Sequence, residues 1–129
     1  MAKAKSYQVI IPSNIYPLPE RHEVSAAQII TKFLKADGEF VIRNNYKSAD
    51  LKVKDEYWEI KSPIGAGKRN IERQLQIAMK QSNNVVLDAR RSKIHIANIR
   101  SRLQYQAKLT KGLRKLLLVT KASKVEVIK

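Results

Sequence analysis

The chain has 129 residues, 43% of them hydrophobic, and contains no cysteine. This length predicts a single domain spanning residues 1–129, large enough to bury a hydrophobic core. The lack of cysteine excludes disulfide bonds, cysteine-based zinc sites and a thiol nucleophile. Lysine and arginine total 26 against 11 acidic residues, so the formal net charge is +15. Such a charge predicts a polyanionic partner, of which nucleic acid is the usual one.

The positive charge is unevenly distributed along the chain. No acidic residue lies between Asp88 and Glu126, a stretch that holds eleven lysines and arginines. Surfaces that need only solubility usually mix both signs, so this stretch predicts a nucleic-acid-binding face. The longest apolar run, at 116–119, is far shorter than the roughly 20 residues of a membrane-spanning helix. We therefore expect no membrane partner, and the lack of cysteine and of a secretory signal favours action in the cytoplasm.

The N-terminal half predicts one helix followed by strands. Residues 1–19 contain three prolines and are expected to be irregular, apart from a short edge strand in YQVII, whereas residues 20–129 are expected to form the compact core. Apolar residues at helical spacing predict a helix over about 23–35. The segment FVIRN at 40–44 is typical of a strand, and ADLKVKDEYWEIK at 49–61 predicts a hairpin with its turn near 54–56.

The C-terminal half predicts two further helices and three strands. A loop at 62–68 precedes a helix over about 69–81, and NNVVLDARR is typical of a strand after a turn. A third helix begins near Ile96 and is expected to expose Arg100 and Arg102. The segments LLLVT and KVEVI are expected to close the fold as a hairpin. The fold class is therefore α+β, with a mostly antiparallel sheet and helices packed against it.

The first candidate site is the pattern Asp50, Glu59 and Lys61 on the predicted hairpin. Two carboxylates on adjacent strands suit Mg²⁺, and a neighbouring lysine suits the developing charge on a phosphate. The order helix, three strands, helix, strand over residues 23–90 also resembles the PD-(D/E)xK nucleases, although Ala49 stands where their motif usually has proline. This interpretation predicts a Mg²⁺-dependent DNase. The simpler alternative is an ion pair between Glu59 and Lys61.

A second interpretation needs no metal, because the 2′-hydroxyl of RNA can attack its own phosphodiester. The protein must then accept one proton, donate another and balance charge on the phosphorus centre. Glu59 or Asp88 could accept a proton, although an ion pair between Asp88 and Arg90 is equally plausible. The candidate donors are Lys61, Arg90, Arg91, Thr120 and Lys121.

Several motifs in one order resemble a known family. They are EIKSP after the predicted hairpin, a helix ending in KQS, a strand reading VVLDARR and a terminal hairpin containing TK. Over about residues 49–129 the chain resembles the C-terminal tRNase domain of CdiA-type contact-dependent inhibition toxins, in the barnase/EndoU/colicin/RelE-like superfamily of ribonucleases.

The resemblance implies a metal-independent endoribonuclease without a cofactor, with tRNA as the favoured substrate. The family's polar residues correspond to Glu59, Lys61, Asp88, Arg90, Arg91, Thr120 and Lys121. An acidic immunity protein is the expected partner, and the domain is expected to belong to a secreted or mobile-element system. The residues expected to contact RNA are Lys68, Arg69, Lys93, Arg100, Arg102 and Lys115. A non-catalytic nucleic-acid-binding module is the third alternative.

Overall fold

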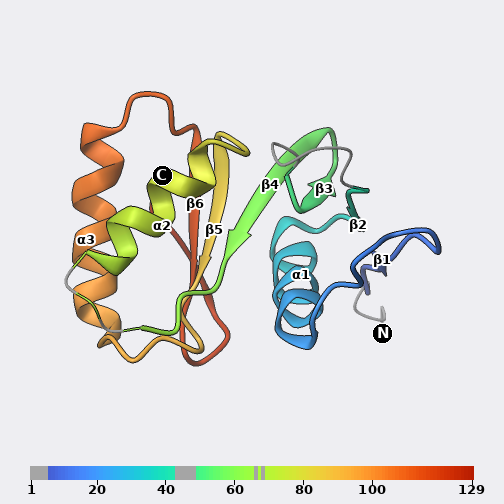
Figure 1. The fold of residues 1–129 in the computed structure, drawn as a ribbon, viewed down its shortest axis with the longest axis horizontal. Helices are drawn as coiled ribbons and strands as arrows, with labels where there is room; N and C mark the ends of the chain where they lie inside the picture. Colours follow the sequence, from blue (N-terminus) through green and yellow to red (C-terminus); the bar gives the residue numbers. More distant parts are fainter. Residues whose placement is uncertain (1–5, 43–48, 66, 68) are drawn as a thin grey trace, which may run out of the picture.

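The computed structural model of the chain describes residues 6–42, 49–65, 67 and 69–129 (Figure 1). In the described residues the elements follow the order β1 (Val9–Ile10), α1 (Arg21–Leu34), β2 (Gly38–Phe40), β3 (Leu51–Val53), β4 (Glu56–Lys61), α2 (Asn70–Met79), β5 (Asn84–Asp88), α3 (Ile96–Leu109), β6 (Lys115–Val119) and β7 (Val125–Val127). This order confirms an α+β domain, and none of these helices is long and apolar enough to cross a membrane.

The strands form one sheet of seven, arranged in the order in which they occur along the chain. The pairings β1–β2, β4–β5 and β5–β6 are parallel, whereas β2–β3, β3–β4 and β6–β7 are antiparallel. The expectation of a mostly antiparallel sheet is therefore wrong. The physical reason is that α2 and α3 are crossover connections, which return the chain so that β4, β5 and β6 run in one direction.

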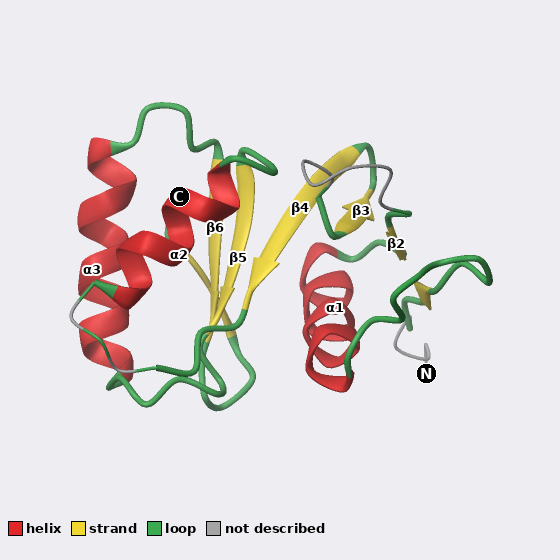
Figure 2. Cartoon of the chain, in the orientation of Figure 1, coloured by secondary structure: helices red, strands yellow, loops and turns green. Residues whose placement is uncertain are grey.

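The helices cover both faces of the sheet, with α1 on one side and α2 and α3 on the other (Figure 2). Strand β5 shows why both faces are covered, since Val85 and Leu87 pack with α2 and α3 while Val86 packs with α1. A strand buried on both faces is a continuous apolar run, which is typical of parallel sheets. At the end of α1, a Cβ atom on Gly38 would lie 2.7 Å from Thr31 Cγ2, so the helix packs tightly on the sheet there.

Most predicted elements are confirmed, with shifts at their ends. Helix α1 begins at a capping box, in which the backbone N–H of Glu20 donates to Glu23 Oε1 at 3.0 Å. The strand expected at 40–44 is wrong in its extent, because β2 ends at Phe40, residues 41–42 are not in a strand, and 43–48 lie outside the described residues. Both predicted hairpins form, and β1 lies within the expected edge segment, paired with β2.

The parallel order of β4, β5 and β6 has a direct consequence for the site. The C-terminal ends of adjacent parallel strands meet at the same edge of a sheet. Lys61 ends β4, Asp88 ends β5, and Thr120 follows β6, with Lys61 paired in register with Leu87 and Asp88 with Val119. The polar residues singled out from the sequence on these three strands therefore share one edge of the sheet.

Candidate active site

Asp50 is fixed beside strand β4 by two hydrogen bonds. Its backbone N–H donates to the carbonyl of Trp58 at 3.1 Å, and its Oδ2 atom accepts from the backbone N–H of Ile60 at 2.9 Å. Both bonds follow from the β3–β4 hairpin, whose turn contains Lys54 at a φ of 55°. Asp50 is only 6% exposed, so its carboxylate is held in a defined place next to Glu59.

Glu59 is the most perturbed carboxyl group of this site. Burial, together with the adjacent Asp50 carboxylate, raises the pKa of Glu59 to about 8, and this outweighs the opposing effect of Lys61. The Nζ atom of Lys61 lies 3.2 Å from Glu59 Oε2. Glu59 is 3% exposed, and among the described residues its Oε1 atom has no hydrogen-bond partner. The predicted ion pair is present, but it does not account for both carboxylate oxygens.

The donor set of this cluster fits a divalent cation. Two buried carboxylates next to each other repel when both are ionised, and a hard cation such as Mg²⁺ removes that repulsion. The buried Oε1 atom of Glu59 is an oxygen ligand without a donor among the described residues. Asp50 and Glu59 are therefore the residues that could hold a metal ion here, and Lys61 lies beside them.

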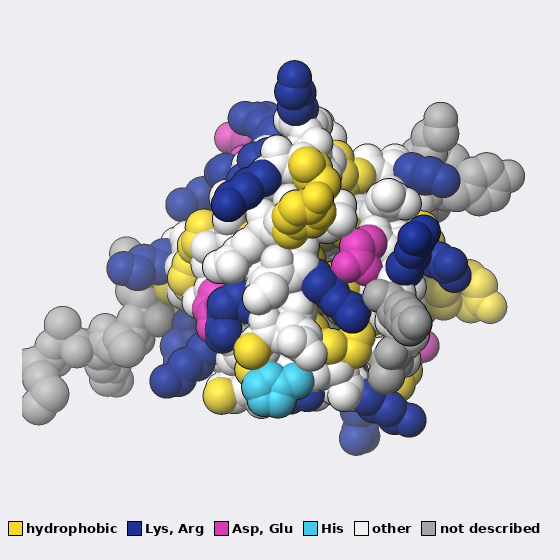
Figure 3. Space-filling model, turned by 90° about the vertical axis from the view of Figure 1, so that its left-hand side faces the viewer, with side chains coloured by type: hydrophobic (Ala, Val, Ile, Leu, Met, Phe, Trp, Pro, Cys, Tyr) yellow, Lys and Arg dark blue, Asp and Glu magenta, His cyan; other side chains and the backbone are white. Residues whose placement is uncertain are grey.

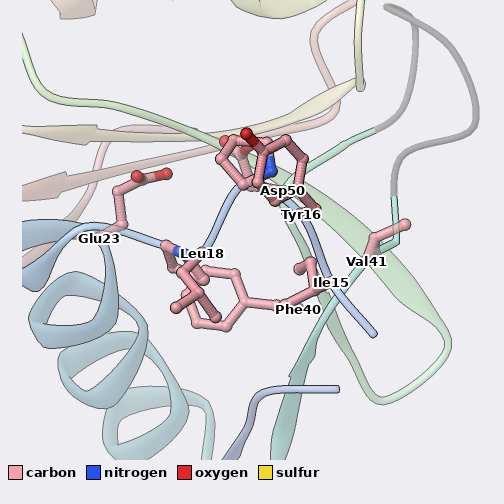
Figure 4. A pocket seen from close by; sticks show the side chains of 9 residues that line it. Ile15, Tyr16, Leu18, Glu23, Phe40, Val41 and Asp50 are labelled. Carbon is pink, nitrogen blue, oxygen red and sulfur yellow. The ribbon is translucent and has the colours of Figure 1, made fainter. Parts of the chain in front are cut away.

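Glu23 is a further acidic residue near this cluster that the sequence interpretation did not include. It lines a pocket together with Asp50 (Figure 4), although it stands on α1, 27 positions earlier in the chain. The only sequence signal was its spacing from Glu20, which is that of a helix start. Glu20, His22 and Glu23 also have side-chain ligand atoms within 4.8 Å of one another, and the capping box and a 3.3 Å contact between His22 and Glu20 explain this group.

Asp88 and Arg90 form a buried pair at the end of β5. Asp88 is fully buried, and its carboxylate accepts from Arg90 Nε at 2.9 Å and from Arg90 Nη2 at 2.8 Å. The same guanidinium donates to the Ser25 hydroxyl and the His22 carbonyl of α1, and the Ser62 hydroxyl lies 3.5 Å from Asp88. Hydrogen bonding to Asp88 raises the pKa of Arg90. This arrangement ties α1 to the sheet, and Arg90 donates a hydrogen bond to each carboxylate oxygen of Asp88.

The remaining predicted catalytic residues lie in the connections after β5 and β6. Thr120 is buried, and its hydroxyl accepts from the backbone N–H of Lys124 in the β6–β7 turn. Lys121 donates from Nζ to the carbonyl of Ile94 at 2.9 Å, which joins this turn to the segment before α3. Arg91 is exposed. Thr120 and Lys121 thus make hydrogen bonds that hold the fold together, and the catalytic roles of these two residues stay predictions.

Half of the residues predicted to contact RNA are held in ion pairs with carboxylates. The pairs are Arg100–Glu126 at 2.6 Å, Arg102–Glu72 at 3.8 Å and Lys115–Glu56 at 2.7 Å. Arg69 and Lys93 are exposed, and Lys68 lies outside the described residues. Lysine and arginine side chains are spread around the face that carries α2 and α3, with few acidic groups among them (Figure 3). The basic surface is therefore broad rather than a single stripe on α3.

Comparisons with known proteins decide the family. Residues 47–125, more than half of the chain, match the contact-dependent growth inhibition CdiA C-terminal domain. The chain belongs to this family. Among solved structures, a chain of the CdiA-CT/CdiI toxin and immunity complex from Burkholderia pseudomallei is similar, with a TM-score of 0.62 and 18% identity over 95% of this chain and 98% of that chain. No curated protein matches the sequence significantly.

The CdiA resemblance inferred from the sequence is thus confirmed. The similar solved chain, at 18% identity, shows a shared fold. This similarity covers 95% of the chain and so includes α1, which lies before the residues that match the family. The barnase/EndoU/colicin/RelE-like superfamily and the tRNA substrate stay predictions. The order of elements from α1 to β5, with three strands between the first two helices, is the one noted for the PD-(D/E)xK nucleases.

Proposed function

We propose that this CdiA C-terminal domain is a nuclease that hydrolyses RNA with a divalent cation held by Asp50 and Glu59. The single observation that carries the proposal is the convergence of two buried carboxylates and the Lys61 ammonium at the β3–β4 hairpin. The active site is that of the PD-(D/E)xK alternative. The choice of RNA, with tRNA favoured, rests on the resemblance to CdiA tRNase domains.

The contacts at the strand ends favour the Asp50, Glu59 and Lys61 cluster as the reaction site over the residues that follow β5 and β6. Of the two proton acceptors considered for a metal-independent RNase, Asp88 accepts two hydrogen bonds from Arg90, whereas Glu59 lies in the cluster with Asp50 and Lys61. The Thr120 hydroxyl and the Lys121 ammonium are committed to the β6–β7 turn and the Ile94 carbonyl. By contrast, the ion pair of Glu59 and Lys61 and the interaction of Glu59 with Asp50 lie within the cluster itself.

The residues of the cluster have distinct roles in such a hydrolysis. The oxygen of a water molecule bonds to phosphorus as that water loses a proton to solvent, and the bond to the leaving oxygen breaks as that oxygen takes up a proton from solvent. The Lys61 ammonium is placed to donate a hydrogen bond to a phosphate oxygen, where negative charge accumulates. Asp50 and Glu59 would hold the cation as carboxylates, so the raised pKa of Glu59 means that a proton would first have to leave it. A divalent cation held there would neutralise phosphate charge and favour the deprotonation of water.

The protein partner we propose is an acidic immunity protein. The similar solved chain belongs to a toxin and immunity complex, and this chain has a net charge of +15. Opposite charge accelerates association and suppresses wrong partners. The domain would act on RNA in the cytoplasm of the inhibited cell.

The test uses the pure protein with tRNA and, separately, plasmid DNA. Cleavage of tRNA that stops in EDTA and returns with added Mg²⁺ or Mn²⁺ supports the proposal. Cleavage that persists in EDTA would instead support the metal-independent RNase. Metal-dependent cleavage of DNA alone would support the DNase, and salt-sensitive binding without cleavage would support a binding module. Asp50→Asn should abolish cleavage, whereas Asp55→Asn, an exposed carboxyl in the same hairpin, should not.

A further inference from the structure

A pocket opens directly beside the carboxylate cluster. It is bounded by the segment before α1, by the first turn of α1 and by β2, and Asp50 forms part of its wall. Figure 4 shows Asp50 and Tyr16 at the top of the pocket, Glu23 at the left, and Leu18 and Phe40 next to each other below them. Its volume is about 130 Å³, below the roughly 300–1,000 Å³ of pockets for drug-sized ligands, so it suits one small group rather than a larger ligand.

The walls of this pocket expose apolar surface that the fold does not use. Tyr16 is 89% exposed and Leu18 is 70% exposed, whereas Phe40 at the base is 3% exposed. An aromatic ring at the mouth and aliphatic groups behind it form a surface on which a flat, weakly polar ring can stack. Glu23 adds an acceptor suited to the amino groups on base edges.

We propose that this pocket binds one unstacked nucleobase next to the phosphodiester that the domain cleaves, with Tyr16 as the stacking residue. The inference rests on the proposed function, because Asp50 belongs both to the pocket wall and to the cluster that holds the scissile phosphate. A base and its own phosphate are joined through one sugar. A phosphate bound to a cation at Asp50 and Glu59 therefore brings an adjacent base to the pocket.

The pocket also defines the class of substrate. A base in a closed duplex is stacked on both faces and cannot enter a pocket on the protein, whereas a base in a loop is free to do so. The domain should therefore cleave single-stranded RNA segments, such as the loops of tRNA, and spare their stems.

The experiment measures binding separately from cleavage. A single-stranded RNA of about 12 nucleotides is compared with versions that lack one base at each position in turn. Binding is measured with the Lys61→Ala protein in Ca²⁺, a hard cation that carboxylates also bind, and the RNA is checked on a gel after each measurement. Tyr16→Ala is added to this background, and Tyr105→Ala, an exposed tyrosine on the opposite face of the sheet, is the matched control.

The proposal expects one position at which loss of the base weakens binding about 5- to 150-fold, as measured for stacked bases. Tyr16→Ala should weaken the binding of intact RNA by a similar factor, and removal of the base should then cause no further loss of binding. In Tyr16→Phe and Tyr105→Ala, removal of the base should still weaken binding. The inference is overturned if the loss of binding caused by the missing base persists in Tyr16→Ala, or if no missing base weakens binding. Tyr16 would then be assigned to a contact with a protein partner. Cleavage by the unmodified protein is scored separately, so failure of the nuclease proposal is recognised independently.

Discussion

The Oδ2 atom of Asp50 accepts a hydrogen bond from the backbone N–H of Ile60 at 2.9 Å. This bond holds a side chain at the start of β3 against the strand that carries Glu59. Burial and the adjacent Asp50 raise the pKa of Glu59 to about 8 and so favour its neutral form. Five predictions concern this cluster and its surroundings.

Lys61→Ala is expected to lower the rate of RNA cleavage about 100- to 1,000-fold, the usual cost of losing one donor to a transition-state charge. The fold should persist, because Lys61 is partly exposed and has one ion-pair partner among the described residues. Lys52→Ala is the control, since Lys52 stands on the same hairpin over the Tyr57 ring. Normal turnover together with a lower melting temperature would show that Lys61 is only structural.

Glu59→Gln is expected to change how the free energy of unfolding depends on pH. The folded pKa of Glu59, about 8, lies above its usual 4.5, so Glu59 favours folding fully below pH 4.5 and loses this contribution as the pH rises through 8. The glutamine side chain of the variant does not ionise, so the free energy of unfolding of the variant should not fall in this way. The variant should therefore become more stable relative to the unmodified protein as the pH increases. Urea unfolding in EDTA at pH 5, 7 and 9 measures the effect, and parallel pH profiles would contradict it.

Divalent cations are expected to stabilise the protein against heat. A cation at ten times its dissociation constant adds about 1.4 kcal/mol, which raises the melting temperature by roughly 4–6 °C for a domain of this size. The rise should be larger at pH 8.5 than at pH 6, because Glu59 must lose its proton to bind. Asp50→Asn should remove the rise and Asp55→Asn should keep it. An equal rise in both variants would place the cation elsewhere.

Arg90→Ala is expected to destabilise the fold by about 3–5 kcal/mol. Removing the guanidinium leaves the fully buried Asp88 carboxylate without its charged partner, which is the costly way to break a buried pair. Arg91→Ala, at the exposed neighbouring position, should change stability by less than about 0.5 kcal/mol. Chemical denaturation compares the two, and equal effects would refute the structural role of the Asp88 pair.

Arg100→Ala is expected to weaken RNA binding less than Arg73→Ala does. Arg100 already donates two hydrogen bonds to Glu126, which lower the pKa of that carboxyl group, whereas Arg73 is exposed on α2. A cation that contacts phosphate contributes about one unit to the salt dependence of binding. RNA-binding titrations at several salt concentrations should therefore show a weaker dependence of affinity on salt for Arg73→Ala, and an unchanged dependence for Arg100→Ala. The reverse order would place the RNA on α3.

The sequence predicted the elements well because each carries a local signal, such as the helical spacing of Ala26 and Ile30. It did not predict strand direction, because whether β5 pairs in parallel depends on where α2 returns the chain. The hairpin pattern predicted that Asp50 and Glu59 meet, since strand alternation is also local. Tyr16 and Glu23 could not be assigned to the same place, because only the packing of α1 on the sheet brings them there.

Helix α1 lies outside residues 47–125, yet Ala26, Ala27 and Ile30 are fully buried in the same core as Leu51 and Trp58. The stretch that identifies the family is thus smaller than the unit that folds. A fragment of residues 47–125 would expose one face of the sheet to water. Arg90 would also lose its hydrogen bonds to the Ser25 hydroxyl and the His22 carbonyl of α1. Any transplant of this domain to another carrier protein must therefore bring the upstream helix with it.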